Sequence, residues 1–333
     1  MGATNVLGRL EASIFKGGSV APEFTPCLDV PSGGVLLGIP ALLSMGLLRH
    51  TNKYFQLPRG YYDLTSIFLL LALMALARLK TIESLRYCSP GEWGKLLGLD
   101  RIPEARTLRN KVKILSNGNK APQWAGELSR DWMGMFPKTA GILYIDGHVR
   151  VYHGKQTELP RHHVARQKLC LRATTDYWVN AMDGQPFFLV NKAVDPGLLT
   201  VLEDEIVPRL ERDIPCQTYH KYPGEDWEVT EFKKHEIKLV SGHEVTMLLA
   251  ERGTFLGGRI WVREIRKLTK SGHQTSIIST AYQRDLAKIA ATMFARWSQE
   301  NFFKYMRENY NIDRLSDYST EEIPDTTQVV CPL

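Results

Sequence analysis

The chain has 333 residues, of which 44% are hydrophobic and 23% are charged. A chain of this length forms about two domains with buried cores, and its composition excludes a disordered, collagen-like or coiled-coil protein. The 42 basic and 36 acidic residues give a net charge of +6, which is a mild preference for polyanionic partners.

The longest uninterrupted apolar run covers residues 67–77, which is 11 residues. A helix needs about 20 apolar residues to cross a bilayer, so this run predicts a buried core helix and no contact with a membrane. The N-terminal residues lack the apolar core of a signal peptide, and the five cysteines include no Cys-x-x-Cys pair. These features predict a cytoplasmic protein in a reducing environment, without a disulfide scaffold or a structural zinc site.

The first third of the chain is predicted to be helical after a loosely ordered start. Residues 1–34 are rich in Gly, Pro and Ser and form an expected lead-in. Apolar spacing typical of helices follows in four segments, residues 35–48, 61–79, 90–97 and 103–115. We therefore expect a helical, basic region over residues 35–130.

The last of these predicted helices is rich in basic residues. It contains one acid, Glu104, and four cations, Arg106, Arg109, Lys111 and Lys113. A short helix followed by a turn and a basic helix is the pattern of a helix-turn-helix element that lies on DNA. A solvated helical surface explains the same pattern equally well.

Strands predominate after residue 140. Residues 141–145 form an apolar run typical of a strand buried on both faces, and this strand is expected to end at Asp146. Further strands are expected over 148–153, 168–173, 186–193 and 216–222, with an amphipathic helix over 198–210. Residues 228–280 are expected to be largely β, with a hairpin turn at Ser241-Gly242, before one long helix over 285–309.

Two carboxylates stand at positions suited to metal binding. Asp146 comes at the expected end of a central strand and precedes Gly147, a common arrangement for holding a divalent ion, although Asp-Gly also forms simple turns. Glu300 lies within the expected long helix and shares one stripe with three cations, Arg296, Lys304 and Arg307. This stripe suits a metal with phosphates, but it also fits a solvated helix with i,i+4 ion pairs.

The helix motif resembles that of the DDE-type insertion-sequence transposases, whose last acidic residue lies in a Tyr-x2-Arg-x3-Glu-x6-Lys pattern. Here the pattern is Met293-x2-Arg296-x3-Glu300-x6-Arg307, and Trp297 follows the arginine as is common in the family. The phrase LYIDGHVRVYHGK resembles the family's stretch with the first aspartate. The resemblance covers residues 35–324.

The resemblance implies an α/β (α+β) fold, a ribonuclease-H-like mixed sheet with helices behind an all-α N-terminal region. The core would comprise residues 131–222 and 281–322, interrupted by a β-rich insertion over 223–280 and followed by a tail over 323–333. Asp146 and Glu300 would be the catalytic metal ligands for Mg²⁺ or Mn²⁺, and Arg296, Lys304 and Arg307 would bind DNA phosphates. The implied partners are transposon ends and target DNA, with a homodimer on DNA in the bacterial nucleoid.

The family's second aspartate has no counterpart here. It lies on a strand after the helix expected at 198–210, whereas in this chain that helix leads directly into 216–222, which resembles the next strand along. Asp213 precedes a strand and Asp226 lies in a turn, so neither takes the role. The 216–222 strand is therefore expected to move beside the strand of Asp146 or to leave that edge exposed.

The missing carboxylate predicts a transposase that binds DNA better than it cuts it, because two metal ions need a bridging carboxylate. One alternative is a catalytically inactive, DNA-binding remnant of a transposase. Another is a helical interaction protein unrelated to DNA.

Four histidines gather after Asp146 but match no zinc-ligand spacing. They are His148, His153, His162 and His163, and they are expected on the surface or facing DNA.

Overall fold

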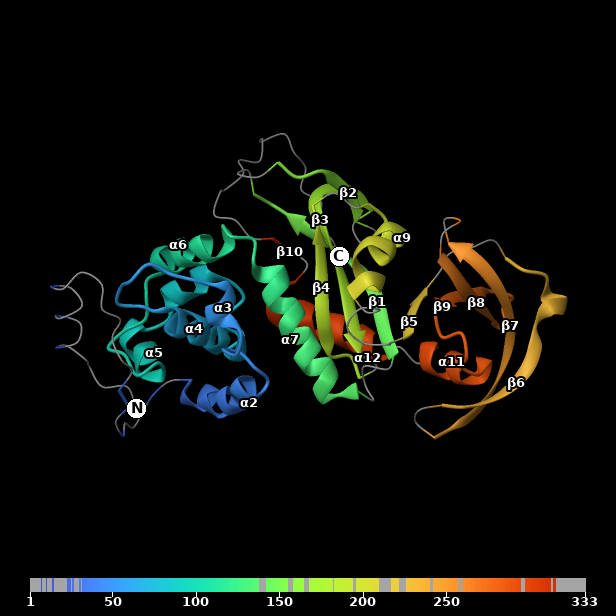
Figure 1. Ribbon diagram of the computed structural model, residues 1–333, viewed down its shortest axis with the longest axis horizontal. Coiled ribbons are helices and arrows are strands. Elements are labelled where there is room, and N and C mark those ends of the chain that lie inside the picture. Colours follow the sequence, from blue (N-terminus) through green and yellow to red (C-terminus); the bar gives the residue numbers. More distant parts are fainter. Residues whose placement is uncertain are drawn as a thin grey trace. The chain divides into compact units, whose positions relative to one another are not determined.

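The computed structural model describes residues 32–137, 142–154, 158–164, 168–181, 183–193, 196–209, 217–221, 226–239, 242–256, 258, 260–294, 297–312 and 314–315, with residues 7, 10, 14, 23, 24, 26 and 30 before them (Figure 1). The chain divides into two compact units. The first comprises Met1–Pro137 with Glu308–Tyr310, and the second comprises Lys138–Arg307 with Asn311–Leu333.

The first unit is helical, as the sequence predicts. Its elements are η1 (Gly33–Gly38), α2 (Ile39–Ser44), α3 (Thr51–Tyr54), α4 (Leu64–Leu76), η2 (Ile82–Tyr87), α5 (Pro90–Leu96), α6 (Ala105–Ser116) and α7 (Ala121–Met135). The expected domain boundary after residue 130 is wrong, because it falls inside the continuous helix α7; the units separate after Pro137 instead.

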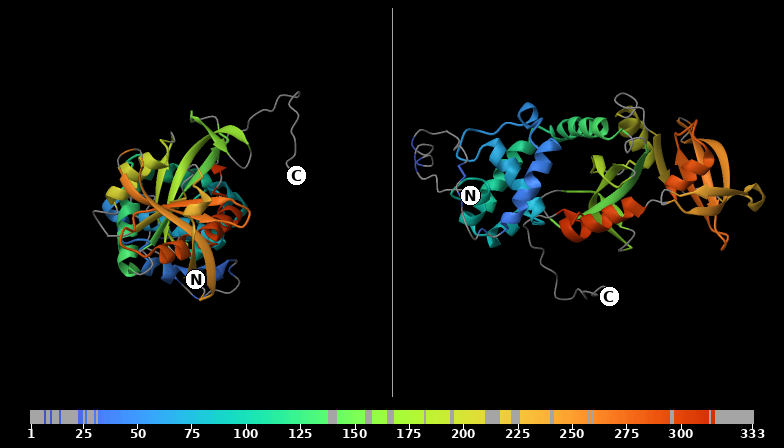
Figure 2. Two further views of the ribbon diagram at one scale, coloured as in Figure 1. Left: turned by 90° about the vertical axis from the view of Figure 1, so that its right-hand side faces the viewer. Right: turned by 90° about the horizontal axis from the view of Figure 1, so that it is seen from below.

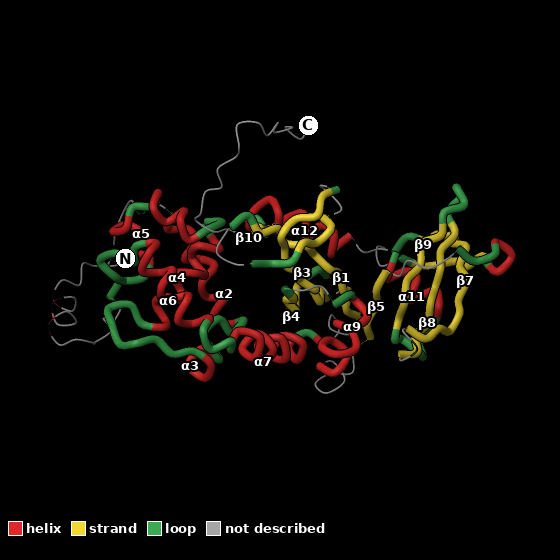
Figure 3. The backbone as a smooth tube through the Cα atoms, turned by 90° about the horizontal axis from the view of Figure 1, so that it is seen from above, coloured by secondary structure: helices red, strands yellow, loops and turns green. Residues whose placement is uncertain are grey.

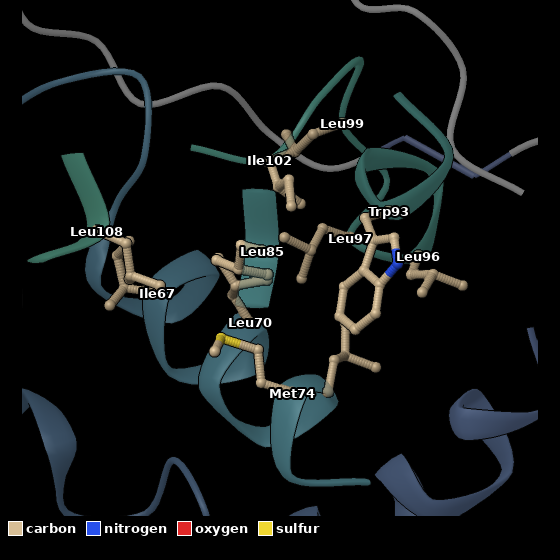
Figure 4. Close-up of a cluster of buried hydrophobic side chains, with 11 residues drawn as sticks. Ile67, Leu70, Met74, Leu85, Trp93, Leu96, Leu97, Leu99, Ile102 and Leu108 are labelled. Carbon is tan, nitrogen blue, oxygen red and sulfur yellow. The ribbon is translucent and has the colours of Figure 1, made fainter. Parts of the chain in front are cut away.

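Helix α4 forms the centre of this unit. Asp63 caps it by accepting a hydrogen bond from the Ser66 backbone N–H at 2.7 Å. Ile67 and Leu70 are fully buried, and side chains from η2, α5 and α6 surround them (Figure 4). The apolar run is thus a core helix, and no described helix is both long and apolar enough to cross a bilayer.

The second unit is built on a mixed sheet (Figure 3). Its strands are β1 (Ile142–Tyr152), β2 (Arg161–Val164), β3 (Leu169–Ala181), β4 (Pro186–Lys192), β5 (Gln217–Lys221), β6 (Lys233–Lys238), β7 (Glu244–Leu256), β8 (Ile260–Leu268), β9 (Gln274–Ser279) and β10 (Arg314–Leu315). Their order is β2-β3-β1-β5-β9-β8-β7-β6, while β4 pairs with β3 and β10 pairs with β1. The helical elements are α9 (Leu198–Val201), η3 (Leu202–Ile206), η4 (Val229–Glu231), α11 (Leu286–Met293) and α12 (Trp297–Tyr310). The α+β class is confirmed.

Strand β1 does not end at Asp146. It runs without interruption from Ile142 to Tyr152 and pairs antiparallel with β3 along almost its whole length. Gly147 lies opposite Tyr177, whose ring stands 3.2 Å from the place that a Cβ atom would take. Gly147 therefore leaves room for the Tyr177 ring within the paired strands and does not form a turn. Asp146 lies in the middle of the strand.

Strand β5 lies at the other edge of β1. It pairs parallel with β1, with Tyr144 beside Tyr219, and antiparallel with β9. Of the two outcomes expected for the 216–222 strand, the structure therefore has the first, in which this strand moves beside the strand of Asp146. Through β5, one continuous sheet joins β1 to the strands of residues 233–279.

The single long helix expected over 285–309 is wrong, because the structure has two helices there. Asp285 caps α11 by accepting hydrogen bonds from the Ala287 and Lys288 N–H groups at 2.9 and 3.3 Å. Helix α11 packs on β6 and β7 through Ala290 and Ala291 and ends at Met293. Helix α12 begins at Trp297, so Glu300 lies in its first turn rather than in mid-helix.

Candidate functional site

One face of β1 contains the predicted catalytic aspartate. Alternate side chains of a strand share a face, and directly paired residues of antiparallel strands lie on the same side of the sheet. This face comprises Tyr144, Asp146, His148 and Arg150 of β1 with Asn180, Trp178, Asp176 and Thr174 opposite them on β3. Asp146 is half-buried at its centre.

Helices α11 and α12 both contact this face. The Tyr144 hydroxyl donates a hydrogen bond to the Thr292 carbonyl of α11 at 2.8 Å. The His148 ring stacks on Phe303 of α12, with ring centroids 5.5 Å apart and planes at 13°. Asp146 thus lies between two residues of β1 that contact the two helices.

Trp178 adds a second group of contacts with α12. This helix is the red one that lies beside the green strands in the right-hand view of Figure 2. Its ring lies 5.3 Å from the ring of Phe302 and 6.4 Å from that of Phe303. Because Trp178 is paired with Asp146 across the strands, α12 packs on the immediate neighbours of the aspartate. We call His148, Trp178, Phe302 and Phe303 the aromatic clamp.

Glu300 lies close to the aromatic clamp along the helix. It is exposed and precedes Phe303 by three residues, which is about one turn on nearly the same side of α12. Asp146 and Glu300 are the two carboxylates that the sequence selects. The structure brings together the strand face that contains Asp146 and the helix that contains Glu300.

The three cations of the predicted stripe have different outcomes. Lys304 is exposed and Arg307 half-buried on α12, while Arg296 lies outside the described residues. Among the residues that the structure describes, neither Lys304 nor Arg307 forms an ion pair with Glu300. The i,i+4 ion pair of a simple solvated helix is therefore not formed between Glu300 and Lys304.

A further carboxylate, Asp176, lies on the same face and was missed from the sequence. It is 1% exposed, accepts a hydrogen bond from Arg150 Nε at 2.8 Å, and accepts another from the Asn191 side chain. Arg150 supplies the opposite charge and Asn191 a further hydrogen bond, so Asp176 links β1, β3 and β4. The sequence signal was the β-branched and aromatic stretch after Ala173, which extends β3 to Ala181.

The strand beside Asp146 supplies no carboxylate. Two residues beyond the Tyr144–Tyr219 pair lie Asp146 on β1 and Lys221 on β5. Asp213 lies outside the described residues, and Asp226 is 74% exposed near Arg266, 3.8 Å away. The described part of the chain contains no group of three His, Cys, Asp or Glu side chains that could hold a metal.

The expectation of four surface histidines is wrong for two of them. His148 and His162 are 8% and 9% exposed because their positions face inwards on β1 and β2. The His162 ring lies within hydrogen-bond distance of the Thr175 hydroxyl at 3.2 Å and the Ala193 carbonyl at 3.1 Å. His153 and His163 are exposed as expected.

The predicted basic helix α6 presents only part of its charge to solvent. Arg106 and Lys113 are exposed, but Arg109 pairs with Glu83, with Nη2 and Oε1 2.5 Å apart. The Lys111 ammonium donates to the Tyr62 carbonyl at 2.9 Å, and burial lowers the pKa of Lys111. Arg109 and Lys111 therefore tie α6 to neighbouring segments of the helical unit.

Comparison with known proteins gives one result. A family model described as "Transposase protein" matches residues 1–218 and 214–333, which together cover the whole chain. No curated protein and no solved structure matches. The match is divided into two segments that overlap at residues 214–218, where β5 begins.

Proposed function

We propose that this chain, which belongs to the transposase protein family, cuts and joins DNA at transposon ends with a DDE-type, ribonuclease-H-like core. The observation that carries the proposal is the packing of α12, the helix of Glu300, on the strand face that contains Asp146. DNA is the partner that membership of this family implies.

The order of the elements supports this assignment. The resemblance implies a mixed sheet whose first strand ends in the first aspartate, then a β-rich insertion, then a helix with a glutamate; here Asp146 lies within β1 instead of at its end. In this chain the same order is formed by β1, the strands β6 to β9 and α12. The parallel pairing of β5 with β1 beside the antiparallel pairing of β1 with β3 makes the sheet mixed.

The donor atoms of the site fit one Mg²⁺ or Mn²⁺ ion. Mg²⁺ is usually held by one or two carboxylates together with water and substrate phosphates, and Asp146 and Glu300 would provide those carboxylates. A bound ion supplies Lewis-acid chemistry: it activates the attacking oxygen and stabilises charge on the leaving oxygen. Lys304 and Arg307, with Arg296, would bind the flanking phosphates and hold the scissile strand.

The same donors do not fit two ions. Residues 217–221 contain no acid, and Lys221 brings a positive charge to the strand beside Asp146. The division of the family match at residues 214–218 supports the loss of a segment with the second aspartate. We therefore propose that the protein, acting as a homodimer, binds transposon ends efficiently and cleaves them slowly.

Purified full-length protein, transposon-end duplexes and Mg²⁺ or Mn²⁺ test this proposal. The wild type is expected to bind with a steep salt dependence, because each phosphate contact contributes a log–log slope of about 0.9. Slow nicking at the transposon end is expected, and D146N and E300Q are each expected to abolish it while retaining binding.

D226N is the matched control, because Asp226 is an exposed carboxylate outside the site. It is expected to bind and nick like the wild type. Nicking by D146N at the wild-type rate would refute the site, and salt-independent binding by the wild type would refute the function. Nicking as fast as binding equilibrates would refute the proposed impairment.

A further inference from the structure

A cavity of about 660 Å³ opens beside the first turn of α11, away from the residues assigned to catalysis. It is lined by Lys238, Leu239, Gln283, Arg284, Asp285, Lys288, Ala291 and Thr292. Three of these residues are cations and one is an acid. They come from the end of β6, the loop before α11 and α11 itself.

The single acid of the cavity is already used within the protein. Asp285 Oδ1 accepts hydrogen bonds from the backbone N–H groups of Ala287 and Lys288, which lie in the first turn of α11. The positive end of the helix dipole offsets the charge of this carboxylate. With Asp285 counted, the lining still carries three positive charges against one negative charge.

The two lysines of the cavity differ from the arginines of the neighbouring strands. Arg252 pairs with Glu231, Arg263 with Glu251, and Arg266 with Glu264. By contrast, Lys238 and Lys288 are exposed and form no ion pair within the described ranges. The unpaired positive charges of these two lysines thus lie at the cavity.

The segment of residues 281–285, which forms part of the cavity wall, is held in place by hydrogen bonds with β8. The buried guanidinium of Arg263 donates through Nη1 to the carbonyls of Ala281, at 2.6 Å, and Arg284. The Tyr282 hydroxyl donates to the Trp261 carbonyl at 2.9 Å. These bonds fix the backbone beside Arg284, so the cavity is preorganised before any ligand arrives.

We propose that this cavity binds a phosphate of the DNA backbone, through the Lys238 and Lys288 ammonium groups. The inference rests on the proposed function, since DNA is the ligand, and it adds a second contact region between the end of β6 and α11. Lysine and arginine are the usual donors to phosphate oxygens, and such contacts position a duplex without reading its sequence.

Salt-titrated fluorescence anisotropy with the full-length protein and a transposon-end duplex tests the inference. K238Q/K288Q removes two charges from the cavity and leaves the hydrogen bonds of the 281–285 backbone intact. One lost phosphate contact is expected to lower the log–log slope by about 1 and to weaken binding about tenfold at 0.1 M salt.

The matched control is K233Q/K234Q, which removes two exposed charges from the same strand, outside the cavity. Its slope is expected to stay at the wild-type value. K238R/K288R retains the charge and is expected to bind like the wild type. Thermal unfolding of each variant verifies that all are folded at the assay temperature.

An equal loss of the salt slope in K238Q/K288Q and K233Q/K234Q would overturn the proposal that the cavity binds phosphate. It would leave the proposed function standing. A wild-type slope in K238Q/K288Q would do the same. Salt-independent binding by the wild type would overturn the proposed function itself, and the inference with it.

Discussion

Helix α6 of the helical unit and the cavity beside α11 of the sheet-bearing unit differ in how their cations are paired. In α6, two of the four cations that the sequence offers for DNA binding already have partners within the protein. Arg109 pairs with Glu83, and Lys111 donates a hydrogen bond to a backbone carbonyl. In the sheet-bearing unit, Lys238 and Lys288 line a cavity and lack a carboxylate partner among the described residues. A run of basic residues in a sequence therefore says less about a ligand than the acids that fold beside it.

The largest expected effect tests whether the aromatic clamp belongs to the site. Phe303→Ala removes a side chain that is 7% exposed and is expected to lower the unfolding free energy by about 3 kcal/mol. It should also abolish Mn²⁺-dependent nicking, because α12 loses its contacts beside Asp146. Denaturant unfolding and end-nicking assays measure the two quantities.

Leu108→Ala is the control from the helical unit, since Leu108 is fully buried in α6. A similar loss of about 3 kcal/mol is expected. Nicking should persist at a temperature where both variants are folded. If the two variants nick DNA equally well, the clamp does not position Glu300.

The second prediction concerns the strand beside Asp146. Lys221→Asp places a carboxylate on β5 at the position that follows the Tyr144–Tyr219 pair by two residues. Nicking in Mn²⁺ is expected to rise about tenfold, which is about 1.4 kcal/mol of transition-state stabilisation. Single-turnover nicking rates provide the measurement.

Lys221→Gln separates the two parts of this change, because it removes the cation without adding an acid. A smaller rise is expected from this variant. Equal rates for K221D and K221Q would mean that a carboxylate on β5 does not complete the site.

The third prediction sharpens the contrast between paired and exposed cations within α6. Arg109→Gln breaks a partly exposed ion pair and is expected to destabilise the helical unit by about 1 kcal/mol. Arg106→Gln alters an exposed side chain and is expected to leave stability unchanged while lowering the salt slope of DNA binding by about 1. The opposite assignment of the two effects would mean that Arg109, not Arg106, faces the DNA.

The smallest effect concerns pH and the packing of α3 against α7. Burial opposes the ionisation of Asp131, but hydrogen bonds from Arg49 and His50 outweigh it and lower the pKa of this carboxyl. A carboxyl whose pKa is lowered in the folded state stabilises that state at pH values above its unfolded pKa, which is near 4. This stabilisation is lost as the pH falls through the folded-state pKa. The helical unit should therefore lose stability below about pH 4.

Thermal unfolding as a function of pH measures this loss. Asp131→Asn cannot titrate, so its stability should be lower at neutral pH and should change less between pH 5 and pH 3. An unchanged acid dependence in this variant would assign the effect to other carboxylates.

Local patterns predicted much of the fold. The helices α4 to α6, the strands β4 and β5 and the hairpin near Gly242 all follow from periodicity and turn residues. Both carboxylates of the site were selected from motifs, and the structure brings their two elements together. What the sequence did not reveal depends on distant pairing, as at Gly147, whose role is set by Tyr177 on another strand.

The break between α11 and α12 is a further difference of this kind. Residues 285–309 contain no Gly or Pro to mark it, and each helix packs on a different part of the sheet. The burial of His148 likewise depends on Phe303, which lies far away in the sequence. The packing around the candidate site therefore could not be predicted from local patterns.

The position of β5 makes folding and catalysis separable traits. An open edge on β1 would be a template for pairing with other chains, and β5 closes part of that edge with backbone hydrogen bonds. Those bonds are the same for nearly every residue type, so the sheet forms whether or not this strand contains an acid. The pairing of β5 with β1 therefore places no requirement on the presence of a carboxylate in this strand.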